Sequence, residues 1–92
     1  MTTRIGLFTH REKVKKGQPS STAIYVEVGT VAELSAKIIA LGAKSAGLMC
    51  RDRAGATRLE GKMFAPSELS AAHFAWLTAK PDAFETRGIF YE

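Results

Sequence analysis

The sequence predicts a single α+β domain with elements in the order β-β-α-β-β-α-β. Five stretches carry apolar residues at alternate positions, as strands do, and two others carry them at helical spacing after helix-capping residues. The 92 residues are the length of one domain, and 46% hydrophobic with 24% charged residues is typical of globular proteins. We therefore expect one compact domain over residues 1–92, with a basic loop at residues 10–21.

The first two strands are expected at residues 4–9 and 22–28. In the first, RIGLFT, the side chains of Ile5 and Leu7 share one face. In the second, TAIYVEV, β-branched residues alternate with Tyr25 and a glutamate, which is the pattern of a half-buried strand.

The first helix is expected over residues 30–41. Thr30 and Glu33 form a capping box, in which the Thr30 hydroxyl accepts from the Glu33 amide and the Glu33 carboxylate reaches back to the Thr30 amide. Apolar residues follow at helical spacing, and Gly42 provides the C-terminal stop.

A β-hairpin is expected over residues 44–64. Its strands are residues 44–51 and 56–64, and the connecting DRAG has Asp at the first and Gly at the fourth position, as a type I turn prefers.

The second helix is expected to open at Pro66 and Ser67 and to end before Pro81. Its predicted buried stripe consists of Leu69, Ala72, His73, Trp76 and Leu77. The final strand, FETRGIFY, is expected at residues 84–91, and its Tyr91 would share a sheet face with Tyr25 if the register allows.

Residues 22–91 have the β-α-β-β-α-β order of ferredoxin-like folds. The right-handed crossover rule places both helices on one face of an antiparallel sheet, so the other face is open to solvent or to a partner. The extra N-terminal strand would add to an edge of this sheet and carry the basic loop there.

The positive charge is concentrated near the N-terminus. Residues 1–21 have a net charge of +4, whereas residues 22–92 hold eight basic and eight acidic side chains and are neutral. Such asymmetry favours binding to nucleic acid or to an acidic protein surface, although lysine-rich loops also maintain solubility or protect strand edges. The five basic candidates are Arg4, Arg11, Lys13, Lys15 and Lys16.

A second basic group surrounds the turn of the predicted hairpin: Arg51, Arg53 and Arg58. These arginines could extend the positive surface and bind phosphates as bidentate forks. The alternative is a solvated turn in which Asp52 pairs with an arginine and contributes little energy.

The sequence Ile24-Tyr25-Val26-Glu27 resembles the start of the first signature of RNA-recognition motifs. The resemblance implies that Tyr25 lies on the open sheet face, where a base could stack. The second signature should lie on the third of the four core strands, but there Gly61 is followed by Lys62 and Met63 instead of aromatic residues. This departure removes the residues that would stack further bases.

The sequence nominates no catalytic residues, metal or cofactor. Its His, Cys, Asp and Glu residues show no metal-ligand spacing, so we expect a protein that is not an enzyme. His73 is interpreted as a core histidine, and Cys50 as a strand residue directed into the core, opposite to Met49. One cysteine and the absence of an apolar run of about 20 residues favour a cytoplasmic setting.

In size and architecture the chain resembles the small phage-encoded anti-CRISPR inhibitors, which share no common motif. The resemblance implies a stoichiometric blocker that binds the protein subunits and guide RNA of an RNA-guided surveillance complex, without catalysis. It also implies that the cytoplasm in which the protein acts is that of a bacterial host cell. Two alternatives remain: a direct RNA- or DNA-binding module that uses the basic loop and Tyr25, and a small-ligand-binding regulator or small enzyme that uses the open face.

Overall fold

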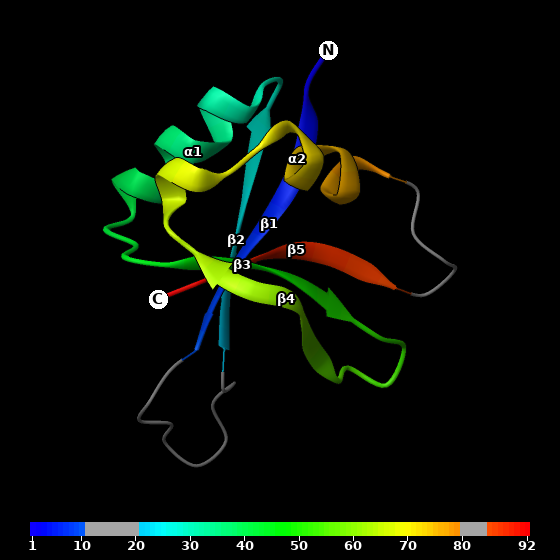
Figure 1. Cartoon of the computed structure of the whole chain (residues 1–92). Helices are drawn as coiled ribbons and strands as arrows, with labels where there is room; N and C mark the ends of the chain where they lie inside the picture. Colours follow the sequence, from blue (N-terminus) through cyan, green and yellow to red (C-terminus); the bar gives the residue numbers. More distant parts are fainter. Residues whose placement is uncertain (11–20, 80–84) are drawn as a thin grey trace.

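A computed structural model describes residues 1–10, 21–79 and 85–92 (Figure 1). The predicted α+β class and element order are confirmed, with one additional 3-10 helix before the second α-helix. None of the helices described is long and apolar enough to cross a membrane. The elements are β1 Thr3–His10, β2 Ser21–Val28, α1 Val31–Ala40, β3 Ala46–Arg51, β4 Thr57–Phe64, η1 Pro66–Glu68, α2 Ala71–Thr78 and β5 Thr86–Tyr91.

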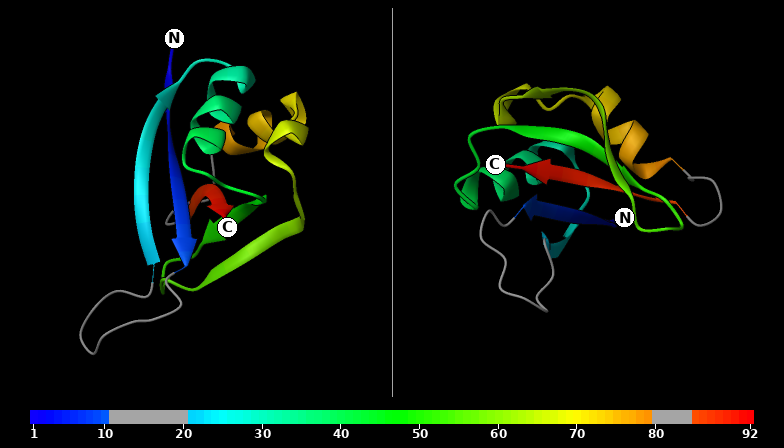
Figure 2. Two further views of the ribbon diagram at one scale, coloured as in Figure 1. Left: turned by 90° about the vertical axis from the view of Figure 1, so that its left-hand side faces the viewer. Right: turned by 90° about the horizontal axis from the view of Figure 1, so that it is seen from below.

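The five strands form one sheet in the order β2-β1-β5-β3-β4. Three neighbouring pairs are antiparallel, and the β1–β5 pair is parallel. Both helices lie on the same side of this curved sheet, as the crossover rule predicts (Figure 2). The arrangement is therefore ferredoxin-like in its element order and its two layers, while the sheet itself is mixed.

The prediction that the first strand adds to an edge of the sheet is wrong. β1 lies between β2 and β5, and β2 forms the edge. The reason is that β1 is apolar on both faces: Ile5 and Leu7 are buried toward the helices, and Phe8 is buried on the opposite face. A strand covered on both sides belongs inside a sheet, whereas β2 leaves Tyr25 exposed and tolerates an edge position.

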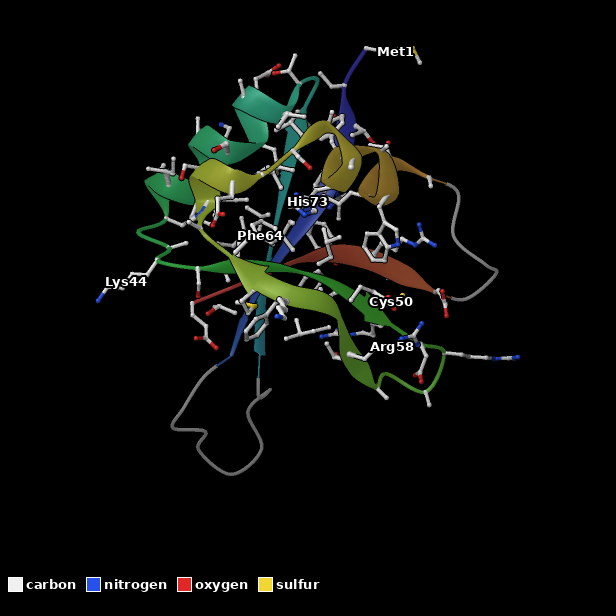
Figure 3. All side chains as sticks on the ribbon, viewed as in Figure 1. Met1, Lys44, Cys50, Arg58, Phe64 and His73 are labelled. Atoms are coloured by element: carbon white, nitrogen blue, oxygen red, sulfur yellow. The ribbon has the colours of Figure 1, made fainter. Side chains whose placement is uncertain are left out.

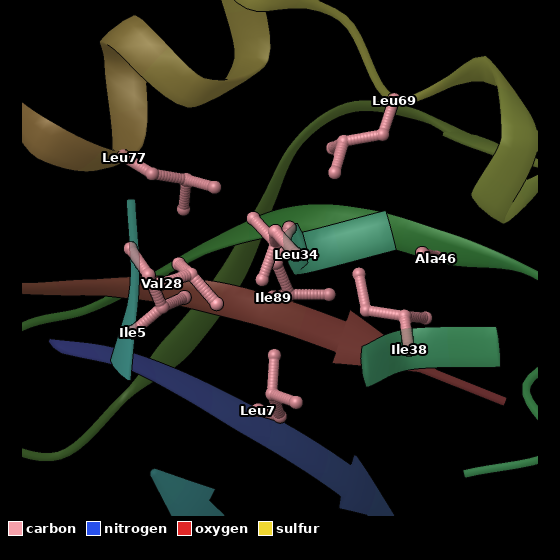
Figure 4. Packing of buried hydrophobic residues seen from close by; sticks show 9 residues of the cluster. All are labelled: Ile5, Leu7, Val28, Leu34, Ile38, Ala46, Leu69, Leu77 and Ile89. Carbon is pink, nitrogen blue, oxygen red and sulfur yellow. The ribbon is translucent and has the colours of Figure 1, made fainter. Parts of the chain in front are cut away.

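The main core fills the space between the sheet and the helices (Figure 4). α1 contributes Leu34 and Ile38, whose side chains are fully buried, and α2 contributes Leu77. Burial of each such side chain stabilises the fold by about 1.5–3 kcal/mol relative to exposure. The buried members of this cluster are Ile5, Leu7, Val28, Leu34, Ile38, Ala46, Leu69, Leu77 and Ile89.

The N-terminus of α1 is capped largely as predicted. The Glu33 amide donates to the Thr30 hydroxyl at 3.1 Å. The Glu33 carboxylate, however, accepts from the Gly29 amide at 3.3 Å and from the Thr30 hydroxyl at 3.2 Å, instead of from the Thr30 amide. At the other end, Gly42 has φ 79°, the left-handed conformation expected after a helix.

The second predicted helix is interrupted. Pro66 opens only η1, and Leu69 then turns into the core and separates it from α2. Ser70 caps α2, because its hydroxyl accepts from the His73 amide at 3.3 Å while His73 Nδ1 accepts from the Ser70 amide at 3.0 Å. This restart changes which side faces the sheet, so Ala72 is exposed and does not belong to the predicted buried stripe.

Candidate functional site: the open face of the sheet

The sheet face opposite the helices is crossed by a row of five residues, one from each strand. Gly6 of β1 pairs with Tyr25 of β2 and with Gly88 of β5. Gly88 in turn pairs with Met49 of β3, and Met49 pairs with Leu59 of β4. Because directly paired residues direct their side chains to the same face, this row brings together side chains from nearly the whole length of the chain.

A second row on the same face is also apolar. Phe90 of β5 pairs with Phe8 of β1 and with Gly47 of β3. The Met63 side chain lies over Gly47, where a Cβ atom would come within 2.5 Å of the Met63 sulfur. We call the two rows together the apolar centre; its side chains are Phe8, Tyr25, Met49, Leu59, Met63 and Phe90.

The Phe8 ring packs directly over two glycines, Gly6 and Gly88. A Cβ atom on Gly6 would come within 2.7 Å of Phe8 Cε2, and one on Gly88 within 2.6 Å of the same atom. The ring therefore lies flat across β1 and β5, and Phe8 is only 3% exposed. Tyr25 meets it edge to face, with ring centroids 6.2 Å apart and an angle of 80° between the planes.

Two arginines pack on these aromatic rings. The Arg4 guanidinium carbon lies 4.5 Å from the centroid of Tyr25, and that of Arg51 lies 5.1 Å from the centroid of Phe8. Both distances suit cation–π contacts, which hold a guanidinium flat on the ring. Opposite Arg4 on β2 is Glu27, whose carboxylate accepts from the Thr2 hydroxyl at 2.9 Å.

The open face therefore has an apolar centre with arginines at one end. Tyr25 is 50% and Leu59 is 46% exposed. At the other end of β1, about 20 Å from Arg4 at the usual rise per strand residue, His10 pairs with Ser21. In the sequence, segment 11–20 connects these two residues. Four predicted candidates, Arg11, Lys13, Lys15 and Lys16, lie in that segment, outside the described residues.

The remaining predicted site residues divide between two faces. Arg4, Tyr25 and Arg51 come together on the open face, whereas Arg53 is exposed in the β3–β4 turn. In that turn the Asp52 carboxylate accepts from the amides of residues 54 and 56, both at 2.9 Å. The turn thus has the predicted Asp and Gly positions, with Asp52 binding the backbone.

The Arg58 side chain does not lie on the open face. It pairs with Cys50 across β3 and β4 and lies on the helix-facing side, where its guanidinium contacts Glu60 at 3.2 Å and Glu85 at 3.6 Å (Figure 3). The hydrogen bond to Glu60 is the main cause that raises the pKa of Arg58 above its ordinary value. With two acidic neighbours, Arg58 adds little to any positive surface.

Cys50 points away from Met49, as predicted, and is buried. Its thiol donates to the Glu85 carboxylate at 3.5 Å. Burial, followed by this hydrogen bond, raises the pKa of the Cys50 thiol above its ordinary value. A protonated, buried thiol is a poor nucleophile, which agrees with the interpretation of Cys50 as a packing residue of β3.

The sequence indicated Tyr25 on the open face but missed most of the apolar centre. Phe8, Met49 and Leu59 were not singled out, and neither was Phe90. The available signal was that β1 and β3 are apolar at consecutive positions, which indicates strands covered on both faces. Tyr91, in contrast, pairs with Ala46 on the helix side, so it does not share the open face with Tyr25.

No known protein family, no curated protein sequence and no solved structure matches this chain. Among residues 1–10, 21–79 and 85–92, no three His, Cys, Asp or Glu side chains are placed to hold a metal ion. Interpretation of function therefore depends on the geometry of the open face and on the charge of the sequence.

Proposed function

We propose that the protein is a non-catalytic binding protein that docks on a ribonucleoprotein through the open face of its sheet. A single observation carries the proposal: on the open face, the half-exposed side chains of Tyr25 and Leu59 flank a buried layer that includes Phe8 and Met49, and arginines pack against the Tyr25 and Phe8 rings.

The composition of the open face is that of a protein interface. Interface centres are enriched in aromatic residues, Met and Arg, and the residues that dominate binding energy are most often Trp, Tyr and Arg. Tyr25 and Leu59 keep about half of their surface in water, so a partner that covered them would gain free energy from their burial. Arg4, held on the Tyr25 ring, is pre-organised to bind an acidic group at the rim of such a partner.

The charge of the sequence supports contact with nucleic acid at the other end of this face. Segment 11–20 holds four of the thirteen basic residues of the chain and begins where β1 ends. Lysines and arginines bind phosphates in a sequence-independent manner, as an exposed guide RNA backbone requires.

The specific form of this proposal is an inhibitor of anti-CRISPR type. An RNA-guided complex holds guide and target in positively charged channels, so it offers both protein surface and RNA backbone to a blocker. The chain has a net charge of +4, which does not suit a mimic of DNA but suits a blocker that uses apolar and basic contacts.

A second candidate is a direct RNA- or DNA-binding module. The half-exposed Tyr25 beside Arg4 favours it, because bases stack on aromatic rings and on guanidinium planes. Four to five phosphate contacts would then give a log–log salt slope of about −3 to −4.5. A protein-docking surface predicts a shallower dependence on salt.

The test is capture of partners from a bacterial lysate by the tagged protein, with and without nuclease. Leu59→Ser removes an exposed apolar side chain from the open face, and Ile39→Ser, on α1, is the matched control because Ile39 is 55% exposed. We expect ribonucleoprotein subunits to survive nuclease and to be lost with Leu59→Ser but not with Ile39→Ser. Binding that disappears with nuclease would favour the nucleic-acid module, and equal binding by both variants would exclude the open face.

A further inference from the structure

The two edges of the sheet are protected to different degrees. β4 forms one edge, and its pairing with β3 shifts register between Ala46 and Leu48, close to Gly61, which has φ 82°. The same strand carries the ion pair between Arg58 and Glu60. Bulges and charged side chains are the usual devices that prevent an edge strand from pairing with another chain.

β2 forms the other edge and lacks these devices. Its eight residues, Ser21–Val28, pair with β1 in continuous register, without a shift. The strand contains no glycine or proline, and Glu27 is its one charged residue. In the part of the chain that the structure describes, no strand pairs with the outer side of β2.

This edge presents both backbone and apolar side chains to solvent. In a strand paired on one side, alternate residues direct their N–H and C=O groups outward. Ile24 is 38% and Tyr25 is 50% exposed, and because they are neighbours in a strand their side chains lie on opposite faces. An exposed, regular, weakly charged edge of this kind is a template for strand addition.

We propose that β2 pairs antiparallel with β2 of a second copy of this chain, so that two five-stranded sheets join into one. A two-fold axis makes such an interface self-complementary. Charge selects this arrangement: the basic segment precedes Ser21 in the sequence, and antiparallel pairing places the two copies of Ser21 at opposite ends of the joined strands, about 27 Å apart at the usual rise per residue. Parallel pairing would place like charges side by side.

The antiparallel pair also suits the side chains of β2. Glu27 lies near one end of the strand. When the two strands overlap over most of their length, the two Glu27 carboxylates are therefore far apart. Val26 and Ile24 of both copies would lie together on the helix side, where Val26 already packs against the core. The two Tyr25 side chains would meet on the open face, which would become one surface across both copies.

The experiment measures mass by light scattering and sedimentation from low to high micromolar concentration. Val26 and Glu27 are adjacent, so one of their amides points to β1 and the other points outward. Of the variants Val26→Pro and Glu27→Pro, one therefore removes only an outward donor, and circular dichroism identifies it as the folded one. We expect the wild type to dimerise as concentration rises, the folded proline variant to remain monomeric, and Lys62→Ser on β4 to dimerise like the wild type.

A wild type that stays monomeric, or a folded proline variant that still dimerises, would overturn the proposal. If both proline variants unfold, amide hydrogen exchange of the wild type at two concentrations provides the test. The dimer predicts that all central β2 amides become protected at high concentration, whereas a monomer leaves alternate amides exchanging rapidly. Protection of β2 that appears only when a captured ribonucleoprotein is added would reject the second copy as the occupant.

Discussion

The ring of Phe8 lies over Gly88 on the neighbouring strand, so close that a Cβ atom on Gly88 would come within 2.6 Å of the ring. Gly6 supports the same ring from its own strand. The absence of two side chains thus permits an aromatic residue to lie flat on the open face, where Tyr25 and Arg51 cover it.

We expect Gly6→Ala and Gly88→Ala each to lower the free energy of unfolding by about 1–3 kcal/mol, because the added methyl group displaces the Phe8 ring. Urea unfolding followed by circular dichroism measures this loss. The loss of stability caused by each of these two substitutions should differ when Phe8 is also replaced by Leu. The atoms nearest to a Cβ atom on Gly6 belong to the side chains of Phe8 and Tyr25, so Gly6→Ala should cost less stability in the Phe8→Leu background.

Gly88→Ala should remain destabilising in the Phe8→Leu background, because its Cβ atom would also lie 2.7 Å from the backbone oxygen of Gly6. If each glycine substitution lowered the stability by the same amount with Phe8 present as in the Phe8→Leu background, the clash with the Phe8 ring would not be the cause.

Ser70→Ala should lower the stability by about 1 kcal/mol, the usual cost of removing an N-cap hydroxyl. The Ser70 hydroxyl accepts from the His73 amide, and α2 has only eight residues over which to compensate. Ser67→Ala, at an exposed position in η1, is the matched control and should change the stability little. A similar melting temperature for Ser70→Ala and wild type would show that the cap is dispensable.

The Cys50 thiol should react slowly with iodoacetamide at neutral pH and faster only at strongly alkaline pH, because its pKa is raised. The raised pKa means that the folded protein holds this proton more tightly than the unfolded chain does. The resulting stabilisation is complete below the ordinary value of 9.0 and is lost as pH rises through the raised pKa. The Cys50→Ala variant should not show this loss of stability at alkaline pH.

Glu85→Gln provides the control for that pH profile. It removes the carboxylate that accepts from the thiol, so the alkylation midpoint should move to lower pH. The shift should be partial, since burial is the larger cause and remains in the variant. An unchanged midpoint would mean that Glu85 does not influence the thiol.

Arg4→Gln should weaken binding to a captured partner by severalfold, because it removes the guanidinium that Tyr25 holds in place. Lys37→Gln, on the exposed surface of α1, removes the same charge away from the open face and serves as the control. Binding measured at two salt concentrations separates a local contact from a change in net charge. Equal weakening by both variants would indicate that only overall charge matters.

Local signals in the sequence predicted most elements of the fold. The capping residue Thr30 fixed the start of α1, and Asp52 and Gly55 fixed the hairpin turn, because each acts through bonds to residues nearby in sequence. The break at Leu69 was missed because burial of one leucine, a tertiary effect, outweighed the helical pattern around it.

The candidate site was less accessible to sequence reasoning, because it depends on register. Tyr25 and Leu59 lie in one row only through three intervening strands, and no local pattern specifies those pairings. The sequence also groups Arg51 with Arg58, and the structure does not bring them together. The two residues are close in sequence, but β-strand alternation places them on opposite faces of the sheet.

The parallel pairing of β1 with β5 also determines how the chain must fold. Gly6 and Gly88 are neighbours in the sheet but lie nearly the whole length of the sequence apart, so closing this pair has a high entropic cost and is slow. Before β5 is available, β1–β2 and β3–β4 are two separate hairpins, and isolated hairpins are at best marginally stable in water. During synthesis on a ribosome the sheet would therefore assemble in a single late step, when the last strand joins both halves.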